Sequence, residues 1–160
     1  MRILIINPNT STKMTDRIRA VANAVKRDDC EVVVTCLDRG PITIESSYDE
    51  AYAIGPTIDL VKQAVAEGGY DVIILACFCE IGVEATREIA DIPVLGLEEP
   101  TLATALLMGG EFAVMTEQRP RVIGKLQNQL AEVTTGRKIK IGPVSKQTGP
   151  VSESSPAAAA

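Results

Sequence analysis

The residues best placed for chemistry are a cysteine and a short polar loop. Cys77 closes an apolar run that begins at Val72, and a helical pattern is predicted from Glu80 onward. A thiol at a helix N-terminus lies at the positive end of the helix dipole, which lowers its pKa from about 8.5 toward neutrality. Such a thiolate can remove a proton from a carbon next to a carbonyl, or attack an electrophile. Spacing alone leaves equally open a second interpretation, in which Cys77 is a small buried side chain.

The polar loop covers residues 7–11, Asn-Pro-Asn-Thr-Ser, between the apolar run Ile3–Ile6 and a helical pattern. A loop between a buried strand and a helix directs free backbone N–H groups toward a bound carboxylate, imide carbonyl or phosphate. Thr10 or Ser11 could serve instead mainly as the N-cap of the helix. Neither a G-x-G-x-x-G nor a Walker A sequence occurs, so nucleotide binding lacks its usual signature.

The inventory of ionisable side chains restricts the chemistry further. The sequence has no histidine and four cysteines, which are Cys30, Cys36, Cys77 and Cys79. Cys77 and Cys79 have the wrong spacing for zinc, so we expect no metal site. Acid–base catalysis must come from Cys, Asp, Glu, Lys or Tyr, and triads that need an imidazole are excluded. Cys30 and Cys36 flank one predicted strand and are interpreted as structural.

Charge and hydropathy exclude several classes of partner. The chain of 160 residues carries a formal net charge of −5, so no basic face is expected for nucleic acid or an anionic membrane. The longest apolar run, residues 72–78, is too short to cross a bilayer, and the N-terminus does not resemble a signal peptide. We therefore expect a cytoplasmic protein whose partner is a small-molecule substrate.

Short apolar runs alternate with helical patterns along the chain. The runs, which predict strands, are residues 3–6, 32–37, 72–77, 94–97, 112–115 and 139–144. Amphipathic helical faces are predicted at Met14, Ile18, Val21, Ala22 and Val25; at Ile54, Ile58, Val61 and Val65; and at Val122, Leu126, Leu130 and Val133. Continuously apolar strands favour burial on both faces. The fold class is therefore α/β, with a doubly wound, mainly parallel sheet and flanking helices.

Parallel strands of one sheet end at the same edge, where ligands bind. Four predicted strand ends carry unusual residues: 7–11, 77–80, 96–99 and 116–117. Any one of them alone is best explained as a polar exit from a strand. The four together predict a binding site.

The motifs of the chain, in their order and approximate spacing, resemble those of one family. They are Ile6-Asn7-Pro8-Asn9-Thr10-Ser11, Met14-Thr15, Ile44-Glu45, Asp49-Glu50, Tyr70-Asp71, Ala76-Cys77-Phe78, Pro93-Val94-Leu95-Gly96 and Ala113-Val114-Met115-Thr116. This series resembles the hydantoin and allantoin racemases of the aspartate/glutamate racemase superfamily. The resemblance covers roughly residues 1 to 120.

The resemblance implies a cofactor-independent enzyme with two similar α/β domains and the active site between them. In this family each domain contributes one cysteine, and the two cysteines lie on opposite faces of the chiral carbon of the substrate. Cys77 matches the first of these catalytic cysteines. The positions that match or adjoin the substrate pocket of the family are Asn9, Thr10, Ser11, Phe78, Cys79 and Thr116.

The sequence departs from this family pattern in its second half. The family places its second cysteine late, whereas here no cysteine follows Cys79. We expect residues 1–98 to form a first α/β domain, residues 99–145 part of a second, and residues 146–160 a linker-like or disordered tail. So small a second domain buries little core, which favours a homo-oligomer. The alternatives are maleate isomerase or arylmalonate decarboxylase chemistry, or a non-catalytic small-molecule binding domain.

Overall fold

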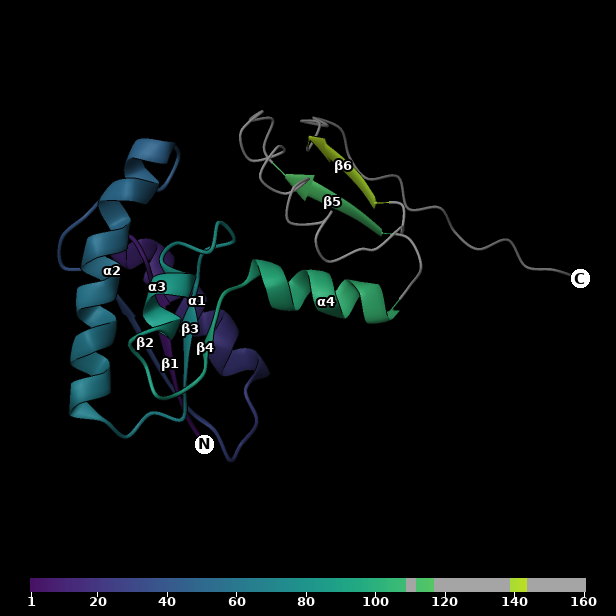
Figure 1. Cartoon of the computed structure of the whole chain (residues 1–160). Helices are drawn as coiled ribbons and strands as arrows, with labels where there is room; N and C mark the ends of the chain where they lie inside the picture. Colours follow the sequence, from purple (N-terminus) through teal and green to yellow (C-terminus); the bar gives the residue numbers. More distant parts are fainter. Residues whose placement is uncertain (109–111, 117–138, 144–160) are drawn as a thin grey trace, which may run out of the picture. The chain divides into compact units, whose positions relative to one another are not determined.

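The structure is a computed structural model that describes residues 1–108, 112–116 and 139–143. The chain divides into two compact units, Met1–Met108 and Gly109–Ala160. In the first unit strands and helices alternate (Figure 1), in the order β1 (Arg2–Asn7), α1 (Thr12–Val25), β2 (Glu31–Cys36), α2 (Ser47–Glu67), β3 (Val72–Leu75), α3 (Val83–Arg87), β4 (Val94–Leu95) and α4 (Glu98–Met108). The second unit contains β5 (Phe112–Thr116) and β6 (Ile139–Pro143).

The first unit is built on a four-stranded sheet in the order β2-β1-β3-β4, and all neighbouring strands are parallel. Ile6 pairs with Thr35 on one side and with Leu75 on the other. The runs of Ile and Val that form these strands suit a pleated sheet with both faces covered. The predicted α/β class with a parallel sheet and flanking helices is therefore confirmed.

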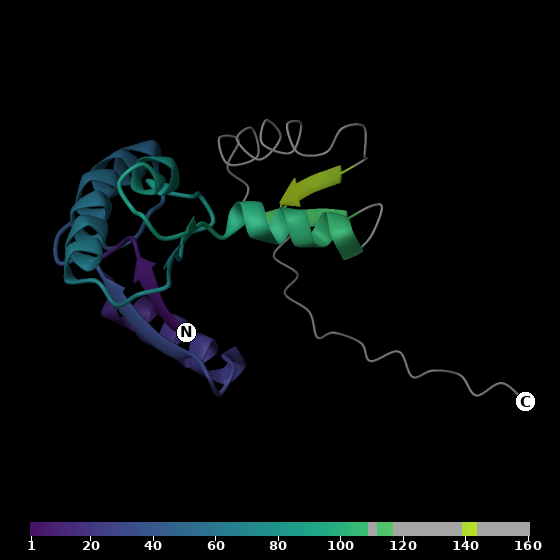
Figure 2. The ribbon, with the colours of Figure 1, turned by 60° about the horizontal axis from the view of Figure 1, so that its bottom comes forward.

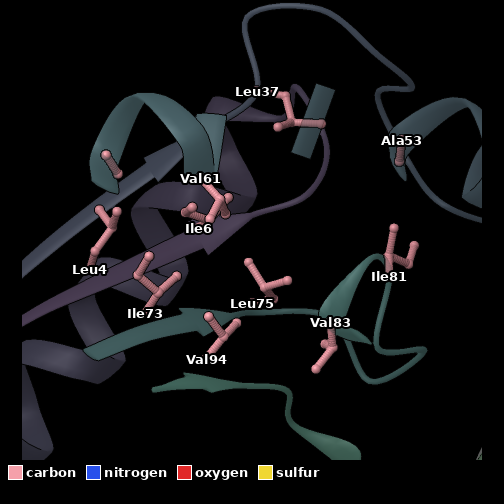
Figure 3. Packing of buried hydrophobic residues seen from close by; sticks show 11 residues of the cluster. Leu4, Ile6, Leu37, Ala53, Val61, Ile73, Leu75, Ile81, Val83 and Val94 are labelled. Atoms are coloured by element: carbon pink, nitrogen blue, oxygen red, sulfur yellow. The ribbon is translucent and has the colours of Figure 1, made fainter. Parts of the chain in front are cut away.

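The two faces of the sheet are covered by different helices. Leu4, Ile6, Ile73 and Leu75 alternate with residues that point to the opposite face, and they pack in one cluster with Val61 of α2 (Figure 3). Ile5 and Val34, one residue out of phase, are buried on the opposite face, where α1 contacts β2 (Figure 2). The apolar residues of α3 join the α2 side, since Val83 belongs to the same cluster.

The predicted buried face of α2 was wrong by about one residue. The buried residues are Ala53, Pro56, Thr57, Val61 and Ala64, whereas Ile54 is exposed. Small side chains let the helix approach the sheet closely, and the buried Thr57 hydroxyl is satisfied because it donates to the Ala53 carbonyl at 2.8 Å. Only Val61 of the four predicted residues is fully buried.

The prediction for α1 was also wrong in part. Met14, Val21 and Val25 are exposed in this unit, whereas Thr15 is buried. Arg19 lies against the sheet, because its guanidinium donates to the Val34 carbonyl at 2.9 Å. Hydrogen bonds to strand and loop, rather than apolar burial alone, therefore select the inward face of α1.

In the second unit β5 and β6 pair in parallel, with Phe112 beside Ile139. They correspond to the strands predicted at residues 112–115 and 139–144. The helical face predicted at Val122, Leu126, Leu130 and Val133 and the tail over 146–160 lie outside the described residues. The division at residues 98 and 145 stays a prediction. Among the described residues, no helix has the length and apolar character that crossing a membrane requires.

Candidate functional site

The candidate site lies at the carboxyl edge of the sheet, around the ends of β1 and β3. The strand order reverses between these two neighbours, because the chain goes from β1 outward to β2 and from β3 outward to β4. After β1 the chain enters α1 on one face, and after β3 it enters α3 on the other. The two loops therefore diverge at the topological switch point, where open α/β sheets bind their ligands. The Ala76 N–H donates to the Ile6 carbonyl at 2.8 Å, so the loops start side by side.

The loop after β1 is shaped by Asn7, which is only 1% exposed. Its amide nitrogen donates to Asn9 Oδ1 at 2.8 Å and to Thr15 Oγ1 at 3.0 Å. The same Asn9 oxygen accepts the Ser11 N–H at 2.9 Å, and Ser11 caps α1 by accepting the Met14 N–H at 3.2 Å. The N-cap interpretation of Ser11 is confirmed. The roles of Asn7 and Thr15 in holding this loop were not predicted from the sequence. An asparagine at the end of an apolar strand is the feature by which the role of Asn7 could have been recognised.

The same loop is tied to the segment after β2. Both the N–H and the hydroxyl of Thr10 donate to the Pro41 carbonyl, at 3.0 and 3.4 Å. The Leu37 N–H donates to the Asn9 carbonyl at 3.1 Å. The backbone of this loop therefore has a fixed shape, and the N–H groups of Thr10 and Ser11 are already engaged within the protein. Substrate contacts of Asn9, Thr10 and Ser11 stay a prediction.

Cys77 lies two residues beyond the end of β3, in a half-buried position at the border of the hydrophobic core. Its N–H donates to the Leu75 carbonyl at 2.9 Å, and its carbonyl accepts the Glu80 N–H at 3.1 Å. The thiol is therefore carried by a tight turn rather than sealed inside a strand. Its catalytic role stays a prediction.

The helix predicted from Glu80 begins only at Val83, with Gly82 as its N-cap. Glu80 and Gly82 have φ angles of 51° and 71°, and this left-handed backbone interrupts a right-handed helix. The helix that results has five residues and starts six positions after Cys77. The expectation that a helix dipole acts on Cys77 was therefore wrong.

The remaining predicted site residues are divided between the two units. Phe78 and Cys79 form the turn after Cys77 and are half-buried, and Cys79 packs against the core cluster. Thr116 ends β5 in the second unit, and its side chain lies outside the described part of the structure. The structure thus brings Asn9, Thr10, Ser11, Phe78 and Cys79 to one edge together with Cys77.

Three glutamates at this edge, Glu80, Glu98 and Glu99, were not predicted individually. Glu98, at the start of α4, is 2% exposed. Its neighbour Glu99 forms an ion pair with Arg87, at 2.7 Å between Oε2 and Nη2. The hydrogen bond to Glu99 raises the pKa of Arg87 and lowers the pKa of the Glu99 carboxyl. The third member is Glu80, which accepts the Glu99 N–H at 2.9 Å.

Cys30 and Cys36 lie at opposite ends of β2, outside the turn that carries Cys77 and Cys79. Cys30 is buried just before β2, at the amino edge of the sheet, so it cannot reach the loops after β1 and β3. Cys36 ends β2 and is half-buried. Within the described ranges, no three cysteine or carboxylate side chains gather closely enough to hold a metal ion.

Several known proteins are similar to this chain in sequence. A family model described as Asp/Glu/Hydantoin racemase matches residues 3–154. A hydantoin racemase from Pseudomonas sp. (strain NS671) is 37% identical over 116 residues, which are 72% of this chain and 46% of that protein. A hydantoin racemase from Paenarthrobacter aurescens is 34% identical over the same length, 72% of this chain and 49% of the relative. The chain thus spans about half the length of these relatives.

Solved structures give a similar result. An allantoin racemase from Klebsiella pneumoniae superposes with a TM-score of 0.80 and is 31% identical, covering 89% of this chain and 58% of that structure. An allantoin racemase from Pseudomonas fluorescens gives a TM-score of 0.76 at 26% identity, covering 88% and 60% respectively.

Proposed function

This chain belongs to the Asp/Glu/hydantoin racemase family, and on that premise we propose that Cys77 is a proton-transfer base. It acts on the carbon next to a carbonyl in a hydantoin-type or allantoin-type ring. The observation that carries this proposal is the place of Cys77. It is a half-buried cysteine in the loop after β3, beside the loop after β1, at the switch point of the sheet. The names of the relatives supply the class of substrate.

The proposed step follows from the acidity of the substrate. The ring proton next to the carbonyl is acidified because the carbanion formed on its removal is delocalised as an enolate. A thiolate is then a sufficient base, and no metal or cofactor enters the proposed step. The thiolate sulfur takes the proton, and the electron pair of the C–H bond moves toward the carbonyl oxygen. The thiol then exchanges its proton with solvent, and return of a solvent-derived proton from the same sulfur to the same face of the carbon completes an exchange without inversion.

The developing enolate oxygen needs hydrogen-bond donors. The N–H groups of Thr10 and Ser11 are engaged by Pro41 and Asn9, so we assign this role to the first turn of α1. A helix leaves its first N–H groups, here those of Thr12 and Lys13, without an intrahelical acceptor. The first turn of α1 also carries no acidic side chain that would repel an anion.

The proposal for this chain is limited to one face of the substrate. Inversion needs a second acid on the opposite face, and the four cysteines of the sequence all precede residue 80. We therefore expect the 160-residue chain to exchange the ring proton of one enantiomer with solvent. Racemisation by this chain would be slow or absent.

The test is deuterium exchange. Each enantiomer of a 5-substituted hydantoin, and of allantoin, is incubated in D2O with the chain, and the label is followed by mass spectrometry above the uncatalysed rate. Cys77→Ser is expected to lose at least about 100-fold of the exchange rate, since general base catalysis contributes on that order. Cys30→Ser is the matched control, because Cys30 lies at the opposite edge of the sheet.

Equal exchange by the wild-type chain and Cys77→Ser would remove Cys77 from the mechanism. If neither variant exchanged the proton but the ligand raised the melting temperature, the second candidate function would be favoured. That candidate is a small-molecule binding domain, and the absence of a cysteine after Cys79 is the sequence observation in its support.

A further inference from the structure

We propose that Glu80 is a positioning residue, whose side chain clamps the turn carrying Cys77 to the start of α4. This inference rests on the proposed role of Cys77. It adds that the place of the thiol is set by the segment that follows the neighbouring strand β4, and not by the loop after β3 alone. Three sets of contacts carry it.

The first set lies in the turn itself. The Glu80 N–H donates to the Cys77 carbonyl at 3.1 Å, and the Glu80 carbonyl accepts the Val83 N–H at 3.3 Å. Glu80 has a φ of 51° and is the one non-glycine residue with positive φ in the described part of the chain. A side chain with a Cβ adopts this backbone only where its surroundings hold it there. The conformation of the Cys77 turn is therefore maintained from outside.

The second set of contacts holds the Glu80 side chain in place. Glu80 Oε1 accepts the Glu99 N–H, in the first turn of α4, at 2.9 Å. The Glu80 side chain lies directly over Gly96, between β4 and α4. A Cβ built on Gly96 would be 2.8 Å from Glu80 Cδ, 2.9 Å from Cγ and closer still to Oε1. A glycine at position 96 is thus required for the Glu80 carboxylate to reach α4.

The third set of contacts holds Glu99, the residue whose N–H donates to the Glu80 carboxylate. The Arg87 guanidinium donates to Glu99 Oε2 at 2.7 Å and to the Val94 carbonyl at 3.0 Å. Glu99 is therefore held by its backbone through Glu80 and by its side chain through Arg87. Because β3 and β4 are hydrogen-bonded neighbours, these contacts connect the Cys77 turn to a rigid part of the sheet.

The contacts also allow a simpler role, in which Glu80 only caps α4 and does not influence Cys77. The two roles differ in what they predict for the thiol. A cap stabilises the helix and leaves the chemistry of Cys77 unchanged. A clamp, when removed, lets the Cys77 turn open, so the thiol becomes easier to alkylate while proton exchange, which needs a fixed geometry, becomes slower.

The test measures iodoacetamide alkylation of Cys77 in the 160-residue chain, with tandem mass spectrometry to separate Cys77 from Cys79. Glu80→Ala is expected to raise the alkylation rate about three- to tenfold, because local opening exposes a half-buried thiol. Glu80→Gln keeps an oxygen that accepts the Glu99 N–H and should remain within about twofold of wild type. Glu84→Gln is the matched control, since Glu84 is an exposed carboxylate that also acts on Arg87 but lies on α3.

A second substitution reaches the clamp from the other side. Gly96→Ala places a methyl group where the Glu80 carboxylate lies, and the side chain can move aside at the cost of its hydrogen bond. Gly96→Ala alone should therefore raise Cys77 alkylation as Glu80→Ala does. In the Glu80→Ala background it should add little, because the clash and the hydrogen bond are both already gone.

The outcomes separate this inference from the proposed function, because alkylation does not require turnover. An unchanged Cys77 alkylation rate in folded Glu80→Ala and Gly96→Ala chains would overturn the clamp even if Cys77→Ser abolished exchange. The same rise in Glu80→Gln as in Glu80→Ala would also overturn it, since loss of charge alone would then explain the effect. Should Glu80→Ala fail to fold, Gly96→Ala and Glu80→Gln still decide between the two roles.

Discussion

Asn7 offers the sharpest test of how the loop after β1 is held. The substitution Asn7→Asp keeps the shape of the side chain and replaces its two N–H donors by an oxygen. In the folded protein these donors contact Asn9 Oδ1 at 2.8 Å and Thr15 Oγ1 at 3.0 Å, and the side chain is almost fully buried. The new carboxylate, which can only accept, would face the amide oxygen of Asn9 and a Thr15 hydroxyl whose proton is already donated to the Ser11 carbonyl.

The magnitude follows from counting what is lost. Each hydrogen bond contributes about 0.5–1.5 kcal/mol net, so two lost bonds give about 1–3 kcal/mol. Asn9 Oδ1 still accepts the Ser11 N–H, and Thr15 Oγ1 still donates to the Ser11 carbonyl. The remaining cost is therefore that of burying the new carboxylate, about 1–3 kcal/mol or more. We expect a total loss of about 2–6 kcal/mol.

The assay is urea unfolding followed by circular dichroism, with the free energy of unfolding extrapolated to water. The matched control is Asn23→Asp, the same chemical change at an exposed asparagine whose amide nitrogen donates to the Arg19 carbonyl at 3.0 Å. Such a surface change should stay within about 0.5 kcal/mol. A loss below about 1 kcal/mol for Asn7→Asp would refute the view that Asn7 organises this loop.

Two further predictions concern stability. The hydrogen bond from Arg87 lowers the pKa of Glu99 in the folded protein, so its contribution is present above the unfolded pKa and is lost as pH falls through the folded pKa. Because both side chains are more than a third exposed, Glu99→Gln should cost at most about 0.5 kcal/mol near neutral pH, and thermal melts should converge with wild type in acid. A constant difference at all pH values would contradict this. For α2, Val61→Ala at the fully buried position should cost about 1–3 kcal/mol in urea unfolding, and Ile54→Ala less than about 1 kcal/mol. A similar cost at both positions would support the helical face predicted from the sequence, which contains both residues.

Local patterns made the strands predictable from the sequence. The buried strands are short runs of β-branched residues, and each run was found within one or two residues of its observed bounds. The helix cap could be narrowed to Thr10 or Ser11 because capping depends on residues a few positions apart, and the structure shows that it is Ser11. The place of Cys77 after β3 also follows from this local signal.

Features that depend on contacts distant in sequence were not predictable in the same way. The inward face of α2 is chosen by small residues such as Ala53 and Ala64, whereas the sequence pattern gave more weight to Ile54 and Ile58. The start of α3 is delayed by the left-handed backbone at Glu80. That backbone depends on a contact with α4, 19 residues away. Hydrophobic periodicity contains no information on either choice.

The two loops at the candidate site are held by different means, and this bears on catalysis. The loop after β1 is fixed from within, through buried Asn7 and its bonds to Asn9 and Thr15. The turn after β3 that carries Cys77 is tied to the start of α4, through Glu80 over Gly96. A base that removes a proton from carbon must be held close to its productive position before the substrate arrives, because small displacements reduce the rate strongly. If Cys77 is that base, Glu80→Ala should therefore lower the rate of proton exchange, while Glu80→Gln and Glu84→Gln should leave it close to that of the wild-type chain.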